Sequence, residues 1–325
     1  MQYNHLGDSG LQVSAVGLGC MNFGAMNDEA QSAAVVGAAL ELGVNLFDTA
    51  DVYGERGKSE EFLGRALGAR RQEVVIATKF AGPMSSDRFD MQGGSRRYIM
   101  QAVEASLARL GTDYIDLYQM HRYDDDTPIE ETLRALDDLV RQGKIRYFGC
   151  SNYAAWQIAD AVWTASSANL NSFISVQNRY SLLKRDIEKE VEPVCEKFGL
   201  GILPYFPLES GLLTGKYRKG EEMPEGTRLA LWAKFATSAF ATDENFAKVD
   251  ALQSLCDRYD HSLLDMAMGW LASRPSVASV IAGVTSPAQL EQNVTAGEWR
   301  PGAEELEEID EITAPLVETF GPARR

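Results

Sequence analysis

The chain has 325 residues, four cysteines and a formal net charge of −16. A charge of this sign argues against nucleic acid or acidic membranes as partners bound through a general electrostatic field. The cysteines show no CxxC or framework spacing, the N-terminus has no apolar stretch of signal type, and no apolar run is long enough to span a bilayer, so we expect a cytoplasmic protein.

The first elements of the chain are predicted to be a short hairpin and a barrel strand. Residues 1–15 form the hairpin, with its turn at 8–10, and the apolar residues 16–19 form the strand. A strand–helix alternation then runs to the C-terminus, which is typical of a parallel sheet. The length and the even strand spacing favour the α/β class, as a single (β/α)₈ TIM barrel domain over residues 1–325.

Two helices are well marked. Ser95 is positioned to cap the first, whose predicted buried face is Ile99, Val103, Leu107 and Leu110. The second begins at residues 127–130, which read as a capping box with proline at the first helical position. Its predicted buried face is Leu133, Leu136 and Val140.

Two long segments interrupt the alternation. Residues 81–94 follow the third predicted strand, and residues 208–244 follow the seventh. Loops longer than about 12–15 residues in compact domains are usually functional or disordered. Both segments follow the carboxyl ends of strands, so we predict that they are lids over an active site.

Polar residues follow apolar runs along most of the chain. The carboxyl ends of barrel strands share one rim, so residues at these ends converge on one pocket. They are Asp48, Lys79, His121, Ser151, Asn152, Gln177, Tyr205 and Gly283.

Four residues suggest proton transfer to a carbonyl. Tyr53 has a phenol that needs tuning to act near neutral pH, and a nearby Lys79 cation favours the phenolate and lowers its pKa. Asp48 would hold the Lys79 ammonium, and His121 would orient a carbonyl oxygen. Taken singly, each residue has a structural alternative. Tyr53 could be a surface aromatic and Lys79 a lysine extending from a strand end. Asp48 could cap a turn, and His121 could be a satisfied buried histidine.

The chain resembles the aldo-keto reductase superfamily, and most closely its bacterial branch, which includes the potassium-channel β-subunits. The resemblance covers essentially the whole chain. It is carried by LFDTADVYG (46–54), ATKF (77–80), DLYQMH (116–121), FGCSNY (148–153), VQNRYSLL (176–183), YFPLESGLLTGKY (205–217) and IAGVTSPAQLEQN (281–293).

The resemblance implies a general acid, Tyr53, tuned by Lys79 and Asp48, with His121 orienting the substrate. It also implies a nicotinamide cofactor. Ser151, Asn152 and Gln177 would bind the carboxamide and Tyr205 would stack on the ring. The remaining expected cofactor contacts are Gly19, Met21, Asp48, Pro207, Leu208, Gly211, Leu212, Lys216, Arg228, Gly283, Thr285, Gln289, Gln292 and Asn293.

The phosphate-binding residues depart from the family pattern. Residues 284–287 carry no cation, and Gln289 stands where many members have arginine. The segment PEGTR (224–228) does match a pattern that places an arginine near the 2′-phosphate. NADP(H) is therefore the favoured cofactor, and NAD(H) stays open. Phe206 stands where serine is common, which we expect to change packing more than chemistry.

A Rossmann dehydrogenase is the competing fold for a nicotinamide enzyme. Its fingerprint is matched only by Gly17, Gly19 and Gly24 with a wrong last interval. No metal signature appears, because His5, His121 and His261 are isolated and no HExxH exists.

The predicted function is NADPH-dependent reduction of a small aldehyde or ketone to an alcohol, reversibly. The alternative is a nucleotide-binding, redox-sensing regulatory subunit like the channel β-subunits, and dehydration or isomerisation through transient redox also stays open. Substrate and oligomeric state are not readable from the sequence. An apolar substrate pocket, or equally loop packing, is suggested by Met21, Phe23, Phe80, Phe89, Trp232 and Phe235.

Overall fold

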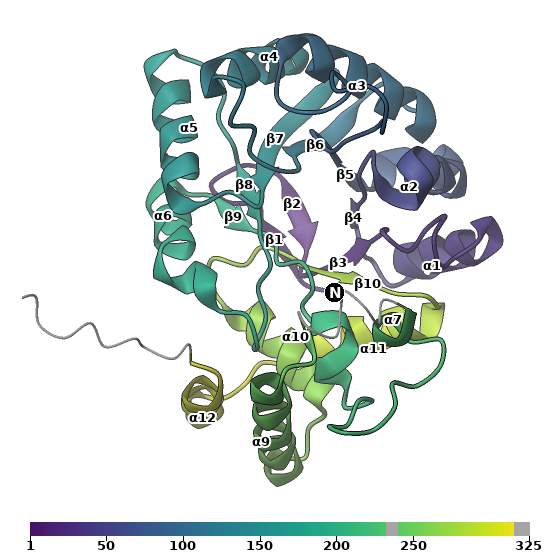
Figure 1. Ribbon diagram of the computed structural model, residues 1–325, viewed down its shortest axis with the longest axis vertical. Helices are drawn as coiled ribbons and strands as arrows, with labels where there is room; N and C mark the ends of the chain where they lie inside the picture. Colours follow the sequence, from purple (N-terminus) through teal and green to yellow (C-terminus); the bar gives the residue numbers. More distant parts are fainter. Residues whose placement is uncertain (232–239, 315–325) are drawn as a thin grey trace, which may run out of the picture.

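The computed structural model describes residues 1–231 and 240–314 (Figure 1). In this part of the chain, one parallel sheet has the strand order β10-β3-β4-β5-β6-β7-β8-β9. A bridge between Ile202 and Val277 joins the last strand to the segment that leads into β10, so the sheet closes into the predicted (β/α)₈ barrel. The strands are β3 (Val16–Gly19), β4 (Leu46–Asp48), β5 (Val75–Phe80), β6 (Ile115–Met120), β7 (Ile145–Ser151), β8 (Ser175–Gln177), β9 (Gly201–Ile202) and β10 (Val280–Gly283).

Helices surround the barrel on the outside (Figure 1). Those that alternate with the strands are α1 (Glu29–Glu41), α2 (Tyr53–Leu67), α3 (Arg96–Leu110), α4 (Ile129–Arg141), α5 (Ala155–Ser167), α6 (Val191–Phe198), α10 (Leu263–Ser273) and α11 (Pro287–Ala296). Two further helices, α9 (Asp243–Tyr259) and α12 (Ala303–Thr313), extend the C-terminal part. Short 3₁₀ turns are η1 (Gly68–Glu73) and η2 (Asp186–Lys189).

The cap of α3 is as predicted, and that of α4 is not. Ser95 Oγ accepts a hydrogen bond from the amide of Tyr98, and the four expected residues on this helix are buried. The prediction of a capping box at residues 127–130 is wrong. Pro128 is the N-cap of α4, and the Thr127 hydroxyl donates a hydrogen bond to Asp124 instead. On α4, Leu139 rather than Val140 completes the buried face.

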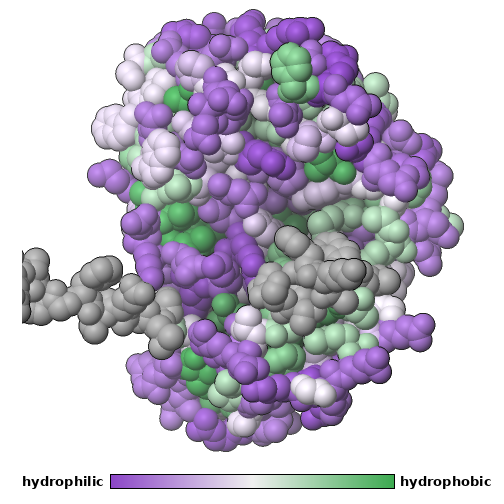
Figure 2. Space-filling view, in the orientation of Figure 1, coloured by the Kyte–Doolittle hydropathy of each residue, from purple (hydrophilic) through white to green (hydrophobic). Residues whose placement is uncertain are grey.

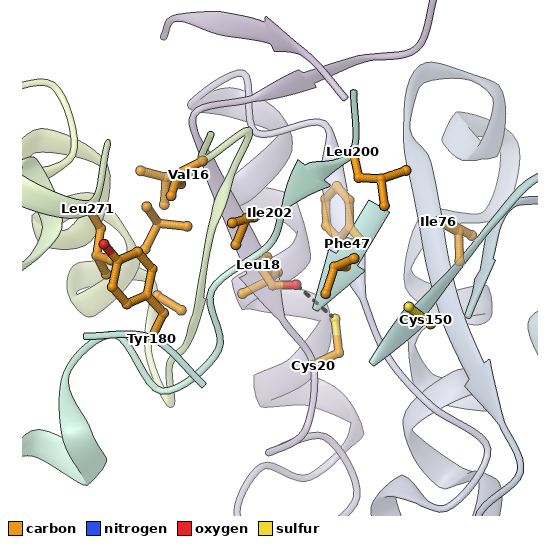
Figure 3. Close-up of a cluster of buried hydrophobic side chains, with 14 of the residues drawn as sticks. Val16, Leu18, Cys20, Phe47, Ile76, Cys150, Tyr180, Leu200, Ile202 and Leu271 are labelled. Atoms are coloured by element: carbon orange, nitrogen blue, oxygen red, sulfur yellow. Dashed lines mark hydrogen bonds between the residues drawn. The ribbon is translucent and has the colours of Figure 1, made fainter. Parts of the chain in front are cut away.

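Apolar side chains fill two layers, because successive residues of a strand point to opposite faces. The inner layer lies within the barrel and includes Leu46, Ala77 and Leu117. The outer layer lies between strands and helices, and Figure 3 shows Phe47, Ile76 and other members of it. The four cysteines are all buried, as expected of small apolar side chains.

The N-terminal hairpin closes one end of the barrel. Its strands, β1 (Tyr3–His5) and β2 (Gln12–Ser14), pair in antiparallel register. Asn4 donates to the Ala278 carbonyl, and Leu6 and Val13 pack into the inner apolar layer. Since Ala278 precedes β10, the hairpin lies at the amino ends of the strands. The carboxyl ends are left to form a site.

The two long loops differ in structure. Residues 81–94 contain neither helix nor strand. Residues 208–244 contain the turn η3 (Glu209–Thr214) and the short helix α7 (Arg228–Leu231). In the described part, Leu212, Tyr217, Leu229 and Phe240 form a small core with Phe246 of α9. Their closure as lids stays a prediction.

No helix in the described ranges is both long and apolar enough to cross a membrane. Figure 2 shows hydrophilic side chains over much of one face, with hydrophobic ones more frequent near its middle.

Candidate active site

A cavity of about 1190 Å³ opens at the carboxyl ends of the strands. Its volume exceeds the roughly 300–1,000 Å³ typical of a pocket for one drug-sized ligand. Asp48, Tyr53 and His121 line one region of its wall. Most of the expected cofactor residues line it too: Gly19, Met21, Ser151, Asn152, Gln177, Tyr205, Pro207, Leu208, Gly211, Lys216, Arg228, Gly283, Thr285, Gln289, Gln292 and Asn293.

Lys79 and Asp48 form a buried ion pair beneath the cavity. The Lys79 Nζ–Asp48 Oδ2 distance is 2.6 Å, and Nζ also donates to the Thr49 carbonyl at 2.9 Å. The Lys79 side chain is 0% exposed and the Asp48 side chain 6%. Burial lowers the pKa of Lys79, but Asp48 and Tyr53 outweigh that effect and raise it, so the ammonium stays charged.

Tyr53 lies between Lys79 and His121. Lys79 Nζ is 5.1 Å from the centroid of the Tyr53 ring, and the Tyr53 and His121 rings meet edge-on at 5.7 Å between centroids. Burial raises the pKa of Tyr53 and Lys79 opposes the rise. The lowering effect that we expected of Lys79 is present, but desolvation is the larger effect and the pKa of Tyr53 is raised overall. Tyr53 is therefore a neutral phenol that holds its proton.

His121 is held as a neutral ring. Burial, together with the Lys79 and Arg122 cations, lowers its pKa to about 3. In the described structure its buried Nδ1 has no hydrogen-bond partner. His121 also lines the cavity, and a neutral imidazole there suits a hydrogen bond to a bound molecule.

Asn152 organises the neighbouring part of the wall. Its φ is +60°, in the left-handed region, where its amide N–H donates to Asn178 Oδ1 at 2.8 Å. Its side chain donates to the His121 carbonyl at 3.0 Å and accepts from the Tyr205 hydroxyl at 2.7 Å. The strand ends of β6 and β7 are thereby joined to the aromatic ring of Tyr205.

Two cations lie in the wall near the long loop. Arg228 donates to Asn22 Oδ1 at 2.7 Å, and burial lowers its pKa. Lys216 lies near Gly211 and Tyr217. Besides Asp48, three carboxylates line the cavity, so its charge is mixed: Glu225, Asp265 and Glu291.

Comparison with known proteins identifies the family. The model described as "Aldo/keto reductase family" matches residues 15–314. The chain belongs to this family. It is an oxidoreductase with the (β/α)₈ barrel that the sequence predicted.

The names of relatives of this aldo/keto reductase describe different activities. A "probable voltage-gated potassium channel subunit beta" of Arabidopsis thaliana is 38% identical over 304 residues, which are 91% of each chain. A versiconal hemiacetal acetate reductase of Aspergillus parasiticus is 35% identical, over 97% of this chain and 98% of its own. An L-glyceraldehyde 3-phosphate reductase of Escherichia coli O157:H7 is 35% identical, over 97% and 93%.

Several predicted contacts of this aldo/keto reductase are not in the cavity wall. Phe80 is fully buried and stacks on Tyr118 in the outer layer, because it adjoins the inward-pointing Lys79 in β5. Phe23 is fully buried in the same layer, so the pocket interpretation is wrong for both. Phe89 is 90% exposed and does not line the cavity, whereas Trp232 and Phe235 lie outside the described residues.

Leu212 is also misplaced by the sequence prediction. It is fully buried in the small core of the long loop and does not reach the cavity. Its neighbours Glu209, Ser210 and Gly211 have positive φ, so the chain there turns sharply. This irregular turn directs Gly211 to the cavity and Leu212 away from it.

Gln119 is a residue that the sequence analysis missed. Its side chain is buried, and Nε2 donates to Asp48 Oδ1 at 3.2 Å. Gln177 donates to the same oxygen at 2.8 Å, so the expected carboxamide ligand holds the ion pair in this structure. Gln119 lies two residues before His121 on the inner face of β6, and strand alternation was a signal sufficient to find it.

Asp51 is a buried carboxyl outside the cavity. Burial, and then Glu60, raise its pKa to about 8 from 3.8. The folded protein therefore binds the proton more tightly than the unfolded chain. The contribution of Asp51 to stability is fully present below about pH 4 and is lost as the pH rises through about 8.

Asp51→Asn is expected to flatten the pH dependence of stability. In the wild type we expect the free energy of unfolding to fall between pH 5 and 8, by up to roughly 1.4 kcal/mol per pH unit from this group. Urea unfolding at several pH values measures this slope. The exposed Asp113→Asn is the control. Equal slopes in both variants would contradict the assignment.

Proposed function

We propose that this oxidoreductase reduces aldehyde or ketone carbonyls to alcohols with NADP(H). One observation carries the proposal: Tyr53 and a neutral His121 meet in the wall of one large cavity, directly above the buried Lys79–Asp48 pair. A proton donor, a hydrogen-bonding ring and a fixed cation are the groups that a carbonyl needs as its oxygen becomes a hydroxyl.

The residues of the cavity fit a dinucleotide. Amides and hydroxyls from Ser151, Asn152 and Gln177 suit a carboxamide, and Lys216 and Arg228 suit phosphate groups. A Cβ placed on Gly283 would point toward Arg228 and Asn22, so its absence leaves room at the wall. When bound, the reduced nicotinamide supplies a hydride, which no side chain supplies.

The side chains would handle the proton and the oxygen. Tyr53 donates its phenolic proton to the carbonyl oxygen, and the Lys79 ammonium stabilises the phenolate that remains. His121, being neutral, donates a hydrogen bond that orients the same oxygen. Asp48, held by Gln119 and Gln177, keeps the ammonium in place.

A spectrophotometric assay tests this function. Purified protein is mixed with NADPH or NADH at matched concentration and a panel of aldehydes and ketones. We expect absorbance to decay with NADPH and a higher KM for NADH. Lys216→Met is expected to raise the dissociation constant of NADPH several-fold more than that of NADH, because it removes a phosphate-binding cation.

A regulatory role is the second candidate. The Arabidopsis relative described as a channel β-subunit is similar over 91% of the chain, which favours testing it. Tight NADPH binding without turnover of any carbonyl in the panel would support that role against the reductase.

Equal KM values for NADPH and NADH in the same assay would contradict the proposed preference for NADPH.

A further inference from the structure

The backbone that follows Tyr53 has an unusual conformation. Four consecutive residues have positive φ: 63° at Gly54, 59° at Glu55, 66° at Arg56 and 132° at Gly57. Residues with a Cβ enter the left-handed region at a cost in free energy, and normally one at a time. Glu55 and Arg56 are exposed, so their own side chains do not explain the turn. Contacts elsewhere must hold it.

Hydrogen bonds close the segment on both sides of this left-handed turn. Thr49 Oγ1 and Ser59 Oγ are 2.8 Å apart, and the Ser59 hydroxyl also donates to the Cys20 carbonyl at 2.8 Å. At Gly54 there is no room for a side chain, because a Cβ would lie 2.5 Å from the Phe23 carbonyl oxygen. The start of the turn is therefore fixed against the barrel.

The end of the turn is fixed by an arginine from another helix. A Cβ on Gly57 would lie 2.6 Å from Arg109 Cδ, so the Arg109 side chain packs directly on this glycine. Arg109 Nε donates to Glu60 Oε2 at 2.6 Å. The other oxygen of Glu60 accepts from the Thr78 hydroxyl at 2.6 Å.

These contacts join three elements behind the active site. Glu60 is on α2, Arg109 on α3, and Thr78 precedes Lys79 in β5. The Glu60 side chain is fully buried and that of Arg109 is 18% exposed. Neither lines the cavity, so neither touches a bound substrate or cofactor directly.

We propose that Arg109 is a positioning residue for Tyr53, acting through Gly57 and Glu60. By packing on Gly57 and binding Glu60, it holds the left-handed turn that sets the Tyr53 phenol between Lys79 and His121. Small displacements of a reacting group are costly, since a shift of about 1 Å can reduce a rate by about 10²-fold. The inference rests on the proposed role of Tyr53 as proton donor.

The test removes both partners of the ion pair at once. The double variant Glu60→Gln with Arg109→Met leaves no unpaired buried carboxylate, and the Gln amide oxygen can still accept from Thr78. We expect kcat to fall at least tenfold while KM and the dissociation constant of NADPH change less than twofold. Amide hydrogen exchange in a peptide covering residues 49–60 should also become faster in the protein without cofactor.

A matched control makes the same chemical change at the surface. Glu29 and Arg65 form an exposed pair between α1 and α2, with Arg65 Nε 2.5 Å from Glu29 Oε1. Glu29→Gln with Arg65→Met is expected to leave kcat and exchange at 49–60 unchanged. Gly57→Ala approaches the same contact from the other side, and it should reproduce the loss of kcat if the double variant does not fold.

The outcomes separate this inference from the proposed function. Loss of thermal stability with unchanged kcat and unchanged exchange at 49–60 would show a merely structural pair and overturn the positioning role. Loss of kcat accompanied by an equal rise in KM or in the NADPH dissociation constant would overturn it too. If the wild type reduces no carbonyl, the proposed function fails first, and exchange at 49–60 still decides whether Arg109 holds the turn.

Discussion

Replacing Tyr53 with phenylalanine is expected to lower kcat for carbonyl reduction by roughly 10²–10⁴-fold, the usual contribution of a positioned proton donor. The change removes one oxygen and keeps the ring. The edge-on contact with His121 and the contact with Lys79 are therefore retained. NADPH binding, measured by fluorescence titration, should change little. The measurement is single-turnover and steady-state oxidation of NADPH with the best carbonyl of the panel.

Tyr118→Phe is the matched control for this prediction. Tyr118 is fully buried within the barrel strand β6 and does not line the cavity. Removal of the Tyr118 hydroxyl should leave kcat within about twofold of the wild type. If Tyr53→Phe and Tyr118→Phe have equal kcat, Tyr53 is not the proton donor.

Replacing Lys79 with methionine should affect both stability and activity. Asp48 would remain as a buried carboxylate without its cation, which typically costs about 3–5 kcal/mol. The thermal unfolding midpoint should fall by at least roughly 5 °C. Activity should fall as well, because the phenolate of Tyr53 would lose its stabilising charge. Thermal scans of the protein without cofactor measure the first effect and the assay the second.

A second substitution separates the two effects of Lys79. In Lys79→Met with Asp48→Asn the unpaired charge is gone, so we expect most of the stability to return while activity stays low. Lys144→Met removes the half-buried partner of the exposed Glu104 and should change neither quantity. A Lys79→Met variant as stable as the wild type would show that the ion pair is not needed for folding.

The fold was predictable because its signal recurs. Short apolar runs that end in a polar residue mark buried parallel strands, and Asp48, Ser151, Gln177 and Gly283 do end strands of the barrel. Residues at the carboxyl ends of barrel strands lie close together in space, however far apart they are in the sequence. The convergence of Asp48, Tyr53 and His121 on one cavity could therefore be expected without coordinates.

The sequence predictions that the structure contradicts failed for different physical reasons. The outward direction of the Phe80 side chain was predictable in principle, because a residue next to an inward-pointing Lys79 must point outward. The direction of the Leu212 side chain was not predictable, since a turn with three positive φ values follows no periodicity. Glu60 and Arg109 are 49 residues apart and on different helices. Nothing in the sequence pairs them.

The N-terminal hairpin covers the amino ends of the strands, whereas the cavity opens at their carboxyl ends. Asn4 bonded to the Ala278 carbonyl, and Leu6 and Val13 within the inner layer, obstruct the opposite end. In the described ranges, the cavity that Tyr53 lines opens at the carboxyl ends of the strands, so substrate and product reach Tyr53 from that side. A product that stays in the cavity would keep out the next substrate, so turnover should be sensitive to inhibition by its own product. A fusion partner attached at the hairpin would lie at the end of the barrel opposite the cavity, away from the entering substrate and the leaving product.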